Sequence, residues 1–192
     1  MSLPKPPVTR QLLHTRRIEC CGYHREDGLW DIEAYLIDTK SYSFPNKFRD
    51  SIQAGEPLHA LGLRLTLDDN LLIHEATAII DASPFAVCPE ITPRFALLKG
   101  LQIATGWNRK VKNLLGDIKG CTHLVELLAP LATTAYQTIY GATKEKREQE
   151  MAEHPDKKPA LLDSCHALDC NGVVVKTFFP RFYTGATDKY QD

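Results

Sequence analysis

The sequence predicts an α+β domain, an antiparallel sheet of two hairpins with helices packed on one face. Apolar and polar residues alternate in residues 14–40 and again in residues 59–80, and a turn signal interrupts each stretch. After Asp81 the apolar spacing changes to the period of a helix. Hairpins followed by helices are typical of a sheet that buries one side under a helical layer.

The first hairpin is expected in residues 14–40. Asp27-Gly28 favours a tight turn, because glycine tolerates the backbone angles that such turns need. The residues that follow place their apolar side chains on one face, with charged side chains between them. This expected core face consists of Trp30, Ile32, Ala34 and Leu36.

The second hairpin is expected after a polar segment. Residues 41–57 contain Pro45, Gly55 and Pro57, which predict a loop with a short helical turn near Phe48. Beyond it, alternating leucines predict a strand, a cluster of Asp and Asn predicts a turn, and residues 73–80 are rich in β-branched residues. The alternating leucines are Leu61, Leu63, Leu65 and Leu67.

Three helices should follow the second hairpin. Thr92-Pro93 predicts the start of the first, which Gly100 can close. The second should span residues 106–115, and the third should begin at Thr122 and bend at Pro130. The apolar face of the third consists of Leu124, Leu127, Leu128, Leu131, Ala135 and Ile139.

The expected domain organisation has four parts. Residues 1–13 form a Pro-rich arm, and residues 14–142 form the α+β domain. Residues 143–160 are dense in mixed charges and predict a solvated helix end and linker. Residues 161–192 should return to the domain and add a strand, Val173–Phe179, to an edge of the sheet.

Charge and cysteine content narrow the class of protein. With 23 basic and 24 acidic residues the net charge is -1, so neither nucleic acid nor a membrane surface is an expected partner. No apolar run reaches the length of a signal peptide or a membrane span, which predicts a cytoplasmic protein. Six cysteines in a reducing compartment are better explained as core residues, metal ligands or reactive thiols than as a disulfide framework.

The stretch Gly120-Cys121-Thr122-His123-Leu124 carries the strongest chemical signal. A thiol at a helix start faces unpaired amide groups and the positive end of the helix dipole, which favours the thiolate. His123 supplies a second ligand type in the same turn.

Two further residues can join this pair at one edge of the sheet. Cys88 stands between the second hairpin and the first helix, and His59 opens the strand before the alternating leucines. The expected metal ligands are therefore His59, Cys88, Cys121 and His123, a set that suits zinc or an iron-sulfur cluster. Three of them also have an ordinary explanation: a small buried thiol for Cys88, and surface positions for His59 and His123. For Cys121 an ordinary explanation is weaker, because of its position at a helix start.

Two resemblances bear on this hypothesis. Residues 25–33, Arg-Glu-Asp-Gly-Leu-Trp-Asp-Ile-Glu, together with the Gly-Cys-Thr-His-Leu stretch, resemble a bacterial family described only as a domain of unknown function, number 2889. Residues 59–140 are also similar in order to the U-type iron-sulfur cluster scaffold proteins. That similarity implies a scaffold-like core, with Cys88, Lys99-Gly100 and Cys121 at the family's second cysteine, lysine-glycine pair and last cysteine.

The second resemblance has departures. His59 falls near the family's aspartate, Leu58 or Pro57 stands where its first cysteine would be, and Gly120 replaces its histidine. Three functions stay open: a metal-binding or cluster-scaffold protein, a thiol enzyme, or a non-catalytic module that binds a larger catabolic or redox enzyme. In the thiol enzyme Cys121 is the nucleophile, and His123 or His59 is the general base. The sequence does not decide whether the protein is an enzyme, nor what Cys165 and Cys170 do.

Overall fold

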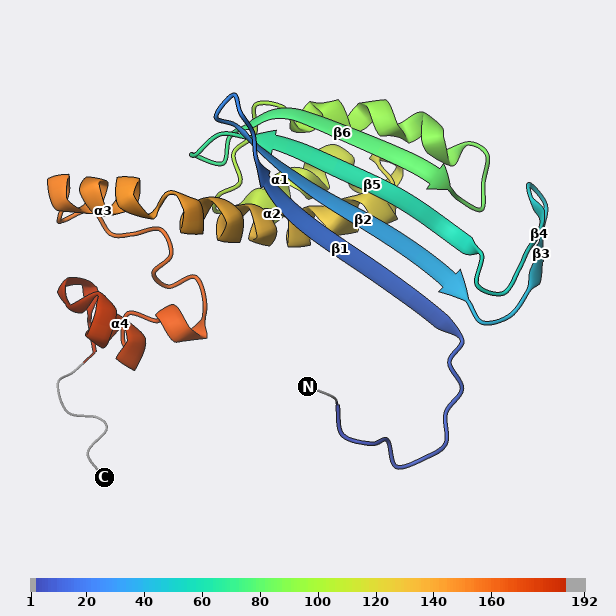
Figure 1. The fold of residues 1–192 in the computed structure, drawn as a ribbon, viewed down its shortest axis with the longest axis horizontal. Helices are drawn as coiled ribbons and strands as arrows, with labels where there is room; N and C mark the ends of the chain where they lie inside the picture. The colour runs from blue at the N-terminus through green and yellow to red at the C-terminus, as the bar shows by residue number, and fades with distance from the viewer. Residues whose placement is uncertain (1–2, 186–192) are drawn as a thin grey trace. The chain divides into compact units, whose positions relative to one another are not determined.

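The structure is a computed structural model that describes residues 3–185. By its internal contacts the chain divides into two compact units, Met1–Thr143 and Lys144–Asp192. The first unit contains an antiparallel four-stranded sheet of two hairpins, in the order β1-β2-β5-β6 (Figure 1). Its strands are β1 (His14–His24), β2 (Trp30–Lys40), β5 (Pro57–Leu67) and β6 (Ile73–Ala82). The predicted α+β fold with two hairpins is confirmed.

The strand register brings the two predicted apolar faces together. Trp30 pairs with Leu67 and Ile32 with Leu65, and the alternate residues from Trp30 to Leu36 and from Leu61 to Leu67 are buried in the same core. Several side chains on the opposite face are exposed, among them Tyr35 at 45% and Ile37 at 42%. The period-2 alternation therefore sets which face of the sheet receives the helices.

Residues 41–57 differ from the prediction. They form a small hairpin of β3 (Phe44–Asn46) and β4 (Asp50–Ile52), not a loop with a helical turn. The Asn46 side chain accepts hydrogen bonds from the backbone amides of Phe48 and Arg49, which closes a tight turn in place of a helical one. Ile52 is fully buried and anchors the second strand of this hairpin.

The first helical segment is the 3-10 helix η1 (Cys88–Leu98), which begins four residues before the predicted start at Thr92. Pro89 and Pro93 lack amide donors, which weakens an α-helical ladder across this segment. Thr92 donates its hydroxyl to the Pro89 carbonyl and does not cap a helix. Phe95 and Leu98 fix the segment by burial in the core.

Two further helices complete the layer. Helix α1 (Trp107–Leu115) agrees with the prediction, and the short 3-10 helix η2 (Asp117–Lys119) follows it. Helix α2 (Thr122–Ala142) comes next and contacts β1, β2 and β5. All six predicted apolar residues of α2 are buried. Gly22 lets α2 approach β1 closely, because a Cβ atom at that position would lie 2.0 Å from Thr138 Oγ1.

The second unit contains helices within its described residues. Helix α3 (Lys144–Glu153) has no buried residue, as expected for the charged run. Three short helices follow it: η3 (His166–Leu168), α4 (Val173–Phe178) and η4 (Pro180–Phe182).

The predicted strand Val173–Phe179 is therefore wrong, since most of it is helix α4. Lys176 and Phe179 donate their amides to carbonyls four residues earlier, and Val175 is buried with Leu162 and Cys170. Burial of one helical face overrides the strand preference of three consecutive valines. Residues 186–192 of the predicted C-terminal segment lie outside the described part of the chain.

Within residues 3–185, no helix has both the length and the apolar character that crossing a bilayer requires.

Candidate metal centre

Asp38 occupies the next core-facing position of β2 after Leu36, and its side chain is only 1% exposed. It pairs with Arg16 on β1 and with His59 on β5, so the three side chains share one face of the sheet. His123 comes from the first turn of α2. The apolar face of the sheet thus ends in a polar cluster beneath the start of a helix.

The Asp38 carboxylate is held from three sides. Arg16 donates Nε to Oδ1 and Nη2 to Oδ2, both at 2.8 Å, in a bidentate pair. His59 Nδ1 lies 3.0 Å from Oδ2, and His14 Nε2 lies 3.2 Å from Oδ1. Because an ionised carboxylate only accepts hydrogen bonds, the Nδ1 atom of His59 carries the proton in this arrangement.

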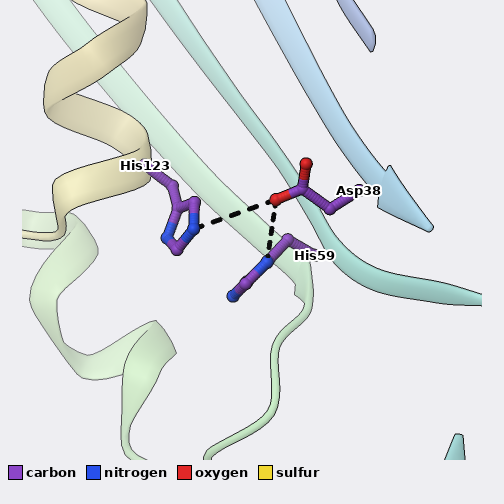
Figure 2. A group of neighbouring side chains, drawn as sticks. All are labelled: Asp38, His59 and His123. Atoms are coloured by element: carbon purple, nitrogen blue, oxygen red, sulfur yellow. Dashed lines mark hydrogen bonds and ion pairs between the residues drawn. The ribbon is translucent and has the colours of Figure 1, made fainter. Parts of the chain in front are cut away.

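The imidazole of His123 completes a group of three side chains that could bind a metal ion. His123 Nε2 lies 3.8 Å from Asp38 Oδ2, and the rings of His59 and His123 have centroids 3.8 Å apart (Figure 2). Asp38, His59 and His123 each offer one ligand atom, and these atoms lie within 4.8 Å of one another. Tetrahedral zinc with bonds of about 2.0–2.1 Å sets its ligand atoms about 3.3 Å apart. The distances of 3.0 and 3.8 Å from Oδ2 lie on either side of that value.

The pKa values of Asp38, His59 and His123 are shifted in the directions that favour binding of a metal ion. Burial alone would raise the pKa of Asp38, but the hydrogen bonds and charge of Arg16, with help from His59, bring it below its usual value. Burial lowers the pKa of His59, as does the nearby His123, and burial with the charge of Arg16 lowers the pKa of His123. Both imidazoles are therefore neutral at pH 7, the form that binds metals.

The surrounding charges favour a cation. Arg16 also forms an ion pair with Glu126 through Nη1. Asp38, Arg16 and Glu126 together carry a formal charge of -1 when the histidines are neutral, so the arginine does not make the cluster positive.

The structure brings together two of the four predicted ligands, His59 and His123. Cys121 is the N-cap of α2 and its Sγ atom lies 4.0 Å from His123 Nδ1, on the other side of the ring from Asp38. Cys88 begins η1. Neither thiol is part of the group formed by Asp38, His59 and His123, so ligation by Cys88 or Cys121 stays a prediction.

Sequence reasoning missed Asp38 and Arg16. A signal for Asp38 is present: it continues the alternation of Trp30, Ile32, Ala34 and Leu36, where a carboxylate on an apolar face must find partners. Within residues 3–185, no other three His, Cys, Asp or Glu side chains place their ligand atoms within 4.8 Å of one another. Cys170 is buried and Cys165 is exposed, so these two thiols differ in their surroundings.

Comparison with known proteins identifies a family but no characterised relative. Neither the curated proteins nor the solved structures contain a match to this chain. The resemblance to U-type iron-sulfur scaffold proteins is not supported by any of these comparisons.

One family model matches residues 14–137. That range includes the whole sheet, η1, α1, most of α2 and every residue of the Asp38 cluster. The chain therefore belongs to the family described as Protein of unknown function, DUF2889.

Proposed function

We propose that this protein binds a divalent transition-metal ion, zinc first, through Asp38 Oδ2, His59 Nδ1 and His123 Nε2. The observation that carries the proposal is the convergence of these donors at the buried end of the sheet. Three protein ligands leave a fourth position for water or substrate, the pattern of catalytic zinc sites.

The donor set selects among metals. Two imidazoles and one carboxylate suit zinc and its neighbours, whereas magnesium and calcium take oxygen ligands and iron-sulfur clusters need thiolates. Ligation through His59 Nδ1 requires its proton to move to Nε2, because Nδ1 donates to Asp38 in the metal-free arrangement.

Arg16 supports this site without being a ligand itself. Its bidentate pair fixes the plane of the Asp38 carboxylate, and Oδ1 can stay with Arg16 while Oδ2 binds the metal. Partners of this kind typically contribute a factor of about 10–100 in metal affinity. Glu126 offsets part of the repulsion between the arginine and the cation.

Cobalt(II) loading tests the proposed ligand set. Cobalt bound by nitrogen and oxygen should show the visible bands of a low-symmetry site without a thiolate charge-transfer band in the near ultraviolet. Cys88→Ser and Cys121→Ser should leave the visible spectrum in place, and His59→Ala should abolish it. A strong thiolate band that disappears in Cys121→Ser would refute the Asp/His/His set in favour of the cysteine ligands expected from sequence.

One observation favours a second function, a thiol enzyme. The imidazole of His123 lies between a thiol and a carboxylate. Its Nδ1 atom is 4.0 Å from Cys121 Sγ, and its Nε2 atom is 3.8 Å from Asp38 Oδ2. In this order Cys121 is the nucleophile, His123 the base and Asp38 the group that orients the base. A metal on His123 Nε2 would exclude this role, so the two functions compete for one ring.

Alkylation separates the second function from the first. For a thiol enzyme, Cys121 in metal-free protein should react with iodoacetamide faster than Cys165, and His123→Ala should remove the difference. If metal is absent and Cys121 reacts slowly, both site functions fail, which would leave a module that binds a partner protein.

A further inference from the structure

A pocket with a volume of about 260 Å³ lies where the β3–β4 hairpin meets β6 and the segment after it. Two of its lining residues, Phe48 and Phe85, are 60% and 53% exposed, which is unfavourable for large rings unless another molecule covers them. The remaining lining residues are Arg49, Ile80, Asp81, Ala82, Ser83, Ala86 and Pro89. The pocket is therefore an uncovered aromatic site on the first unit.

The walls of this pocket are tied to one another. Asn46 Nδ2 on β3 donates to the Pro84 carbonyl at 3.2 Å, and Asn46 Oδ1 accepts from the amide of Phe48. The Phe48 and Phe85 rings meet edge to face with centroids 5.9 Å apart. The pocket therefore exists before any ligand arrives, which lowers the entropy cost of binding.

The Pro-rich arm, residues 3–13, is a second uncovered apolar feature of the same unit. It contains no helix or strand, and each of its residues is exposed. Its three prolines favour an extended backbone close to polyproline II, so the arm loses little entropy when it docks. Its large apolar side chains are all at least half exposed: Leu3, Val8, Leu12 and Leu13.

Hydrogen bonds to Ser41 hold only the base of the arm. The Ser41 amide donates to the Leu13 carbonyl at 3.3 Å, and the Ser41 hydroxyl donates to the Leu12 carbonyl at 2.7 Å. Residues 3–11 lie beyond this anchor, and as polyproline II they would span about 28 Å at about 3.1 Å per residue. That length lets the arm reach a neighbouring molecule.

The arm and the pocket match in chemistry. Proline-rich segments in this conformation bind grooves lined by aromatic side chains, which Phe48 and Phe85 supply. Residues 1–13 contain Lys5 and Arg10 and no acidic residue. The charged residues in the pocket lining, those next to it in sequence and the partner of Arg49 carry a net charge of -2: Lys47, Arg49, Asp50, Glu56, Asp81 and Glu90. Opposite charges therefore draw the arm toward the pocket.

We propose that the Pro-rich arm of one chain docks in the Phe48/Phe85 pocket of a second copy, whose own arm returns the contact. Such an exchange closes on a two-fold axis, so both arms and both pockets are occupied in a dimer. In the single chain the arm and the two rings are all exposed, as a reciprocal exchange requires. This self-association does not depend on the proposed metal site.

Sedimentation equilibrium on the full-length protein should show a monomer–dimer equilibrium. Phe85→Ala should raise the dissociation constant roughly tenfold or more, because truncating an aromatic anchor weakens binding on that scale. Pro6→Gly with Pro7→Gly should also raise it, since glycine frees the extended backbone. The control Tyr23→Ala removes a half-exposed ring at the other end of the sheet and should leave the dissociation constant unchanged. A protein that stays monomeric at every concentration would overturn the proposal.

A synthetic peptide of residues 3–13 tests the contact itself. In excess over the full-length protein it should dissociate the dimer and shift the backbone amide signals of Ala82 and Ala86, and Phe85→Ala should abolish those shifts. A dimer that survives excess peptide would overturn the proposal, because its interface then lies elsewhere. So would a monomer in which Pro6→Gly with Pro7→Gly moves the Ala82 and Ala86 signals, since the pocket would then hold the arm of its own chain.

Discussion

Replacing Asp38 by asparagine probes the cluster most informatively, because the fold and the proposed site both depend on that carboxylate. The new side chain would keep one acceptor oxygen but would turn an amide toward the donors of Arg16 and His59. The change removes the charge from a bidentate pair with bonds of 2.8 Å at a residue that is 1% exposed. Breaking a fully buried pair costs about 3–5 kcal/mol. Arg16 is one-third exposed and keeps Glu126, so we expect a loss of about 2–3 kcal/mol in the free energy of unfolding.

Urea unfolding followed by tryptophan fluorescence measures this loss, since Trp30 and Trp107 are both in the core. The matched control is Asp81→Asn, which neutralises an exposed aspartate outside the cluster and should stay within about 0.5 kcal/mol of wild type. Zinc affinity, measured by competition with a chelating dye, should fall by at least about tenfold in Asp38→Asn alone. An Asp38→Asn protein as stable as wild type would refute the role assigned to the buried carboxylate.

Three further predictions follow from the structure. Gly22→Ala should lower the free energy of unfolding of the first unit by about 1–3 kcal/mol in urea, because the new Cβ would lie 2.0 Å from Thr138 Oγ1. The control Gly28→Ala should strain only the turn. An unchanged urea midpoint for Gly22→Ala would show that α2 does not lie close to β1. In metal-free protein the folded-state pKa values of His59 and His123 lie below their unfolded value of about 6.5, so the unfolded chain binds more protons and stability falls as the pH drops below about 6.5. Urea midpoints at pH 7.5 and 5.5 should show that loss, and His59→Gln with His123→Gln should flatten it; an equal slope in the double variant would contradict the assignment. A chain ending at Thr143 should fold and should bind zinc with the affinity of the full-length protein, since the residues of the candidate metal centre all lie within the first unit. An unfolded circular dichroism spectrum for this chain would contradict that division.

The main fold could be predicted because it depends on simple periodicity. Alternation placed Trp30 through Leu36 and Leu61 through Leu67 on buried faces, and the 3.6-residue spacing identified the apolar face of α2. Where tertiary context decides, prediction failed. Val173–Phe178 forms a helix because Val175 is buried in a small cluster, and the β3–β4 turn depends on hydrogen bonds of the Asn46 side chain.

The site was only partly predictable for a related reason. His59 and His123 were expected from their places at a strand start and a helix start, and the structure does bring them together. The cysteines were favoured because thiols have strong metal chemistry, and their ligation stays a prediction, since spacing along the chain does not determine which way a side chain points. Asp38 was overlooked because its neighbours read as an ordinary strand, although strand pairing alone places it beside Arg16 and His59.

Zinc stoichiometry tests the metal proposal most directly. Protein purified without added metal and then dialysed against zinc should hold one ion per chain by inductively coupled plasma mass spectrometry. His59→Ala and His123→Ala should lose it, and Cys88→Ala should keep it. Zinc that survives both histidine substitutions, or that disappears with Cys88→Ala, would contradict ligation by Asp38, His59 and His123.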